Sequence, residues 1–282
     1  MTDLIKIIED SREKATQIAL DSISSLIGSS EVEVRDKILS KIEEQKEFFP
    51  LGWYDPPFGG VAVLFGNDPY DRLKFETLRD PLFSPSESNF YNKETVSIVY
   101  FSPIEKVTGM IGDIGFTIYD GTDEKIKSHI RDCYNLLLEV ANFAKVGLSF
   151  AELYVFAMDT FINKGQKRIA WMSTNIWKAT NDEKRKINFG HTIPGSFNDF
   201  NLGKSYDDIK ENIRTKRIFI EDGEIFKIPD TSAFTLEFRL TDKDAIMPNT
   251  HFHFIVTFNK GEKKILANFE QIFIKTGMNY ML

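Results

Sequence analysis

The chain has 282 residues, of which 42% are hydrophobic and 27% are charged, a balance that suits a folded protein with a sizeable core. A net charge of -7 argues against nucleic acid as the main partner, and no stretch approaches the roughly 18 uninterrupted apolar residues of a membrane span. The single cysteine, Cys133, excludes an internal disulfide, and the start of the chain does not resemble a signal peptide. These features predict a cytoplasmic protein that binds neither nucleic acid nor membrane.

Helical periodicity is clearest in three segments. Apolar residues recur at helical spacing over about 3–27, 31–47 and 126–144. The pattern Gly-x-Ser-x-x-Glu separates the first two segments at 28–33 and returns after the third at 147–152. In both copies the serine and glutamate predict a capping box that opens a helix, and the repetition suggests a duplicated helix-helix-sheet unit.

Strand patterns follow each helical region. In the first half we expect strands at 95–100 and 115–119, and a further one at 61–65, inside the irregular stretch 52–85. In the second half the pattern predicts strands over 169–172, 232–240, 251–259 and 264–275. The aromatic, proline-containing loop 53–60 is either a wall of a substrate site or a rigid surface loop.

Four acidic or imidazole residues stand in short apolar segments. Asp113 follows Gly-Met-Ile-Gly, His191 lies in Phe-Gly-His-Thr-Ile, Glu237 in Phe-Thr-Leu-Glu-Phe, and Glu270 in Ala-Asn-Phe-Glu. A carboxylate in such a setting is expected to be at least partly buried, and burial without a partner is costly. Three carboxylates and one imidazole form a mixed oxygen and nitrogen set that suits a divalent metal ion.

The order and settings of these residues resemble the creatinase/aminopeptidase, or pita-bread, family, which includes methionine aminopeptidase and the Xaa-Pro peptidases. The resemblance implies an α+β fold in which two pseudo-symmetric helix-helix-sheet halves surround a curved antiparallel sheet. It implies one domain over 1–282, with a first half of about 1–120, a second half of about 121–282 and no separate N-terminal domain.

The resemblance also implies a metal site that departs from the family's pattern. The family uses five ligands in the order Asp, Asp, His, Glu, Glu, and Ser102 stands where the first aspartate falls. Asp113, His191, Glu237 and Glu270 match the remaining four. The expected cofactor is therefore one divalent ion, with Mn, Fe or Zn as candidates.

Histidines that assist catalysis in many family members are missing at their usual positions. Asn198 occupies one of them and can donate a hydrogen bond but cannot shuttle a proton near neutral pH. His251 and His253 alternate with phenylalanines, so both point to one face of a strand. His253 could supply a missing imidazole, although a solvent-facing pair is the alternative. The expected catalytic residues are Glu237, as a ligand that also transfers protons, with His253 and Asn198.

The function that follows from the resemblance is metal-dependent hydrolysis of a peptide N-terminus or a small amide. Its partners would be a short peptide or another small molecule. Dimers are common in the family, so we expect a homodimer. Two alternatives stay open. One is a non-peptidase enzyme of the same fold that acts on a small molecule. The other is a binding module that has lost catalysis.

Overall fold

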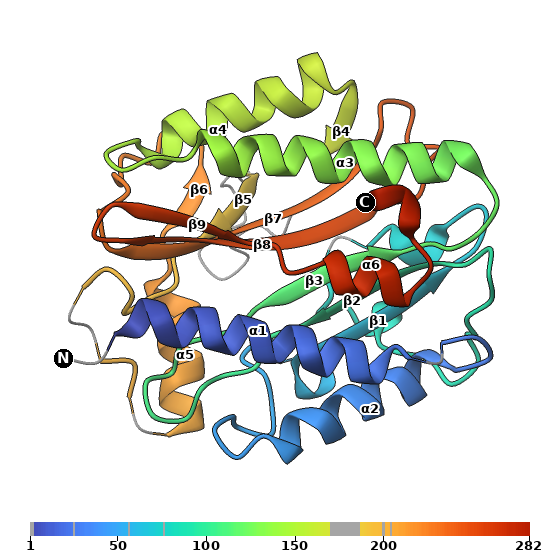
Figure 1. Cartoon of the computed structure of the whole chain (residues 1–282), viewed down its shortest axis with the longest axis horizontal. Helices are drawn as coiled ribbons and strands as arrows, with labels where there is room; N and C mark the ends of the chain where they lie inside the picture. The colour runs from blue at the N-terminus through green and yellow to red at the C-terminus, as the bar shows by residue number, and fades with distance from the viewer. Residues whose placement is uncertain are drawn as a thin grey trace.

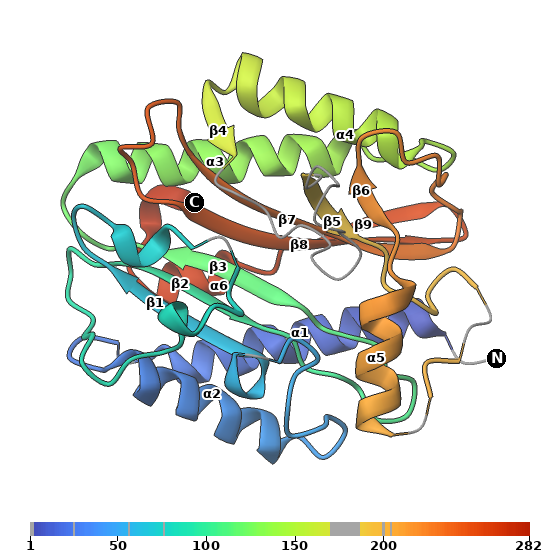
Figure 2. The same cartoon turned by 180° about the vertical axis from the view of Figure 1, so that it is seen from behind.

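The computed structural model describes residues 3–24, 26–55, 57–75, 77–169, 187–198, 201–203 and 205–282. One curved sheet has the strand order β1-β2-β3-β8-β7-β4, with β9 paired to β8, and every neighbouring pair is antiparallel. Helix α2 packs on β1, α3 packs on β7 and β8, and α1 contacts β3, β7 and β8 (Figure 1). Seen from behind, α5 crosses in front of the N-terminal end of α1, and both helices contribute to one hydrophobic cluster (Figure 2).

The first half contains α1 (Leu4–Ser22), α2 (Glu31–Glu44), β1 (Val61–Gly66), β2 (Val96–Phe101) and β3 (Ile114–Ile118). The strand expected at 61–65 is confirmed. Both helices end earlier than predicted, because the chain turns toward Gly28 at φ +80° after α1 and leaves the helical conformation at Gln45 after α2. The capping box that opens α2, from Ser30 and Glu33, is confirmed.

The second half contains α3 (Glu124–Phe143), α4 (Phe150–Met158) with a π-helical extension (Asp159–Lys164), β4 (Lys167–Ile169), β7 (Ser232–Asp242), β8 (Thr250–Asn259) and β9 (Glu262–Leu266). A capping box from Ser149 and Glu152 opens α4, as predicted. Of the strand expected at 169–172, only Ile169 is described, as the last residue of β4; the rest lies outside the described residues.

Additional elements pack around this frame: β5 (Asn188–His191), α5 (Tyr206–Lys216), β6 (Phe219–Glu221) and α6 (Glu270–Lys275). The prediction of a strand over 264–275 is wrong beyond Leu266. Asn268 adopts φ +55°, which ends the extended conformation, and α6 then buries Ile272 and Phe273 at helical spacing from Phe269. Within the described residues, no helix has the length and apolar character needed to cross a membrane.

The two faces of the central sheet differ in chemistry. On β8, Phe252 and Phe254 join the aromatic core on the helix-covered face, where both contact Phe269 of the segment before α6. His253 lies between them in sequence and therefore points to the inner face, directly opposite Glu237 of β7. The inner face of the sheet thus carries the polar residues that the sequence places in apolar strands.

One buried carboxylate anchors the irregular segment 67–90 to this frame. Glu31, whose side chain is 0% exposed, forms an ion pair with Arg72 at 2.6 Å. Its two oxygens also accept hydrogen bonds from the backbone N–H groups of Phe65 and Ser86 and from the side chain of Asn89. Through these bonds α2 holds the segment that carries Phe75, Thr77 and Leu78 to the inner face of the sheet.

Candidate functional site

Asp113 is the most deeply buried carboxylate of the site. It precedes β3 and is 0% exposed. Trp53 Nε1 donates a hydrogen bond to Asp113 Oδ1 at 3.0 Å, and the Ser102 hydroxyl donates to the same oxygen. The other oxygen, Oδ2, has no hydrogen-bond partner among the described residues. Burial raises the pKa of Asp113 to about 6, against the opposing effect of these two hydrogen bonds.

His191 ends β5 and is 1% exposed. Gly190 lets β5 approach β7 closely, since a Cβ there would lie 2.0 Å from the Thr235 carbonyl oxygen. His191 Nδ1 lies 2.9 Å from the Thr192 carbonyl oxygen, which can only accept, so Nδ1 carries the proton. The unprotonated Nε2 faces Glu237 Oε1 at 3.7 Å. Burial holds the pKa of His191 well below its usual value, so the ring is neutral.

Glu237 stands at the middle of β7 and keeps 20% of its side chain exposed. Burial and the neighbouring charge of Asp113 raise its pKa to about 7, against the opposing effect of Arg217 and Arg239. A carboxylate whose pKa is raised by a second carboxylate is expected to gain from a cation that both can bind. Glu237 can also hold or release a proton near neutral pH.

His253 occupies the position on β8 directly opposite Glu237. Its Nε2 lies 3.8 Å from Asp113 Oδ2, and the ring stacks parallel to Tyr100 with 5.8 Å between ring centroids. Neither ring nitrogen has a hydrogen-bond partner among the described residues. His251, two residues earlier, is also buried, so the interpretation of a solvent-facing histidine pair is wrong.

A cavity of about 50 Å³ opens beside Glu237. Arg217 lines it and packs over the Trp53 ring at 4.6 Å, while Arg239 lies over the Phe75 ring at 4.2 Å and donates to the Phe75 carbonyl oxygen. The remaining lining residues are Trp53, Tyr54, Thr77, Leu78, Tyr100 and His251. The loop 53–60 therefore supplies a cavity wall through its first two residues, although Pro56 lies outside the described residues.

Sequence reasoning missed both arginines of this cavity. Arg239 carried a signal, because it stands in the same apolar strand as Glu237 and two residues further on, hence on the same face. Arg217 follows α5 at the end of a basic stretch and has an apolar run, Ile218 to Ile220, on one side only, so it lacks the two-sided apolar setting of Arg239.

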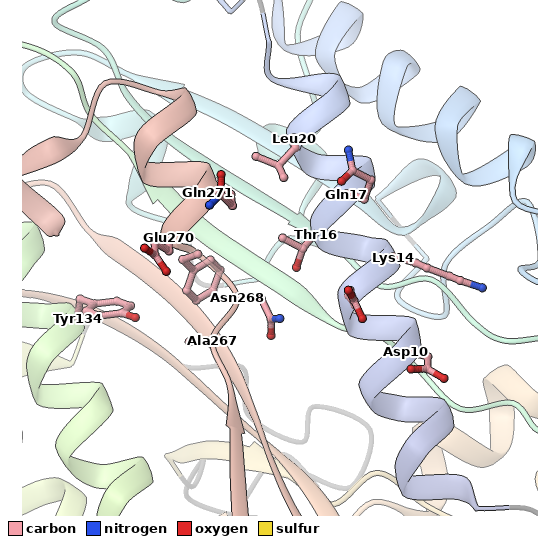
Figure 3. A pocket seen from close by; sticks show the side chains of 12 residues that line it. Asp10, Lys14, Thr16, Gln17, Leu20, Tyr134, Ala267, Asn268, Glu270 and Gln271 are labelled. Carbon is pink, nitrogen blue, oxygen red and sulfur yellow. The ribbon is translucent and has the colours of Figure 1, made fainter.

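Glu270 and Asn198 lie away from this group. Glu270 is exposed at the start of α6, where it lines a groove of about 860 Å³ with Asp10 and Gln17 of α1, on the helix-covered side of the sheet (Figure 3). Asn198 is exposed in the turn that follows β5. The structure thus brings together Asp113, His191, Glu237 and His253, but not the other two predicted residues.

Buried donors and acceptors test whether these residues suit a metal ion. Asp113 Oδ2 and His253 Nε2 face each other without other partners, and His191 turns an unprotonated nitrogen toward Glu237. Carboxylate oxygens and neutral imidazoles are suitable donors for a divalent ion, so the residues fit the group. Within the described residues, no three His, Cys, Asp or Glu side chains form a ready-made metal cage, and the four stand as two pairs.

A buried arginine of α1 holds the backbone of the strands that carry the site. Arg12 of α1 is 0% exposed and donates to the backbone carbonyl oxygens of Asp113, His253 and Ala267. Gly112 allows α1 to come this close, since a Cβ there would lie 2.5 Å from the Ser11 carbonyl oxygen. Burial lowers the pKa of Arg12 to about 9, which leaves it a cation at neutral pH.

Comparison with solved structures identifies the fold as the pita-bread fold of peptidases. The prolidase from Pyrococcus horikoshii matches with a TM-score of 0.63 at 16% identity, covering 95% of this chain and 62% of that one. The X-Pro aminopeptidase from Thermotoga maritima matches with a TM-score of 0.62 at 14% identity, covering 93% of this chain and 60% of that one.

A smaller enzyme matches over nearly its whole length. The methionine aminopeptidase from Thermotoga maritima gives a TM-score of 0.61 at 14% identity and covers 95% of this chain and 97% of that one. This chain therefore spans about 60% of the length of the Xaa-Pro peptidases and nearly all of the methionine aminopeptidase. No protein-family model matches the chain, and no curated protein sequence does.

Proposed function

We propose that this protein is a metal-dependent hydrolase that holds one divalent ion between its two halves. The observation that carries the proposal is the convergence of Asp113, from the first half, with His191 and Glu237, from the second, on the inner face of the sheet. The peptidase fold supports the same reaction class.

The proposal includes a reduced, mononuclear form of the family's metal site. The resemblance puts Ser102 where the family has its first aspartate, and the Ser102 hydroxyl donates a hydrogen bond to Asp113. A neutral hydroxyl used in this way adds no negative charge to attract a second ion. Because Ser102 and Trp53 both bond Asp113 Oδ1, they leave Oδ2 as the oxygen available to the single ion.

A bound ion would lower the pKa of a water molecule and polarise a scissile carbonyl group. The chain's own residues would carry the remaining steps. Glu237, whose pKa is raised to about 7, would accept a proton from the attacking water and return it to the leaving amine. Arg217 and Arg239 would bind a carbonyl or carboxylate oxygen of the substrate in the adjoining cavity.

The cavity supports a small substrate, such as a short peptide or an amino-acid amide. Its volume of about 50 Å³ admits only a small group beside Glu237. The same volume favours the second candidate, a non-peptidase enzyme of this fold that acts on a small molecule. A cytoplasmic location and a homodimer complete the proposal; a single, buried Cys133 supports a reducing compartment.

The test is the metal content of protein purified without chelator, followed by hydrolysis assays on a panel of dipeptides and amino-acid amides. We expect about one ion per chain, and its loss in Asp113→Asn, while Asp71→Asn, at a side chain that is 77% exposed, keeps it. Two ions per chain would show that Ser102 does not reduce the site. No ion after incubation with Mn(II), Fe(II) or Zn(II) would refute the proposal and favour a binding module. Metal without peptide hydrolysis would favour the second candidate.

A further inference from the structure

Resting on the proposed function, we propose that His253 is the fourth metal ligand of the site, in the place that the family resemblance gives to Glu270. The site would then hold its ion with two carboxylates, Asp113 and Glu237, and two imidazoles, His191 and His253.

The register of β7 and β8 carries the first part of the argument. Glu237 and His253 are directly opposed residues of antiparallel strands, so their side chains leave the sheet on the same face and at the same level. Across the sheet, β3 pairs with β8 at Gly115 and His253. Gly115 leaves room for this arrangement, because a Cβ there would lie 2.5 Å from His251 Nε2 and 3.2 Å from His253 Cβ.

Second, buried nitrogens and an oxygen at the site lack hydrogen-bond partners within the part of the chain that the structure describes. His253 is 0% exposed, and both of its ring nitrogens lack partners among the described residues. A buried polar group without a partner is costly, and such groups are rare in folded proteins. The nitrogen nearest to Asp113 lies 3.8 Å from Oδ2, the one oxygen of that carboxylate that also lacks a partner. An ion bound to both atoms would satisfy them together.

Glu270 offers none of these features. It begins α6 on the opposite face of the sheet, is exposed to solvent, and lines the groove against α1 (Figure 3). The aromatic rings of Phe252, Phe254 and Phe269 pack together on that face. Glu270 could reach the inner face only if this packing were disrupted.

Replacing a carboxylate by an imidazole changes which ions the site prefers. Imidazole nitrogen suits Zn(II) and Fe(II), whereas all-oxygen sets suit Mn(II) and Mg(II). The inference therefore names a borderline divalent ion of the Zn(II) or Fe(II) kind as the ligand.

Co(II) titration tests the inference, since Co(II) replaces Zn(II) in mixed nitrogen and oxygen sites and its visible absorption reports the ligands. We expect the wild type to bind one Co(II). His253→Gln should bind Co(II) at least roughly 100-fold more weakly and with a changed absorption spectrum. Loss of a residue that only supports a ligand typically weakens binding by roughly 10–100-fold. Glu270→Gln, the matched control, should keep the wild-type affinity and spectrum.

Two outcomes overturn the inference separately from the proposed function. If Glu270→Gln loses the ion and His253→Gln keeps it, the ligand assignment is wrong but the metal enzyme stands. If the wild type binds no Co(II), Zn(II) or Fe(II), both fall. Because His253→Gln could fail to fold, the proton NMR spectrum of Co(II)-loaded wild type gives an independent reading. Two exchangeable imidazole N–H signals shifted by the ion support two histidine ligands, and a single signal refutes them.

Discussion

Glu31 offers the sharpest test of how the frame of this protein is held together. Replacing it with glutamine keeps the shape of the side chain but exchanges one oxygen for an NH2 group. Each carboxylate oxygen now accepts at least two hydrogen bonds, from Arg72, from the backbone and from Asn89. Whichever oxygen is replaced, the new NH2 group would face the N–H donors that now bond that oxygen, and water cannot help because the side chain is 0% exposed.

The structure sets the size of the effect. The substitution removes the buried charge that pairs with Arg72 and leaves backbone donors at Phe65 or Ser86 without an acceptor. Removing one partner of a buried ion pair costs about 3–5 kcal/mol of unfolding free energy. Glu33→Gln is the matched control: Glu33 caps the same helix from an exposed position, so its replacement should cost far less than that of Glu31.

Urea unfolding of the two variants, followed by circular dichroism, measures these costs. The double variant Glu31→Gln/Arg72→Met separates the pair from the rest of the network: its cost should fall short of the sum of the single variants by about 1–3 kcal/mol. A loss below about 1 kcal/mol for Glu31→Gln, or strict additivity in the cycle, would refute the view that this ion pair anchors segment 67–90.

Three further perturbations have defined outcomes. Trp53→Phe removes the hydrogen bond that favours ionised Asp113, so the pKa of Asp113 should rise above about 6. The affinity for Co(II) should therefore fall roughly 10-fold at pH 6 and by less at pH 8. Equal losses of affinity at both pH values would contradict this reasoning. Arg12→Lys cannot reproduce three bonds to carbonyl oxygens and should lose about 2–4 kcal/mol of unfolding free energy, whereas Arg168→Lys, at an exposed residue, should lose almost none in the same urea experiment. Acid should destabilise the metal-free protein. All four histidines have lowered pKa values, so below pH 6.5 they release protons on folding, whereas Asp113 and Glu237, with raised pKa values, take up two. The net release of about two protons should lower the free energy of unfolding by about 2–3 kcal/mol between pH 6 and pH 5. A melting temperature that does not change over this range would contradict these pKa directions.

Much of this architecture could be predicted from local patterns. The serine and glutamate of each capping box act over one helical turn, and the alternation of His251 and His253 with phenylalanines fixes their face within one strand. Glu237 was found for the same reason, since it interrupts an apolar strand. These signals are local, so the sequence carries them without knowledge of the tertiary fold.

The remainder depended on contacts between distant segments. Glu270 occupies an apolar setting like that of Glu237, yet one residue with positive φ, Asn268, turns the chain into a helix on the other face. Arg12 lies on the apolar stripe of α1, a detectable signal, but its three acceptors come from residues more than a hundred positions away. No spacing rule identifies such partners.

The arrangement of the site also has a mechanical consequence. His191 and Glu237 both belong to the second half, so the separation of that pair is set within one packed unit. Asp113 and His253 belong to different halves, which meet in the sheet where Gly115 pairs with His253 and where Arg12 bridges both. A small rotation of one half against the other would therefore widen the gap between Asp113 and His253, while the distance between His191 and Glu237 would stay the same.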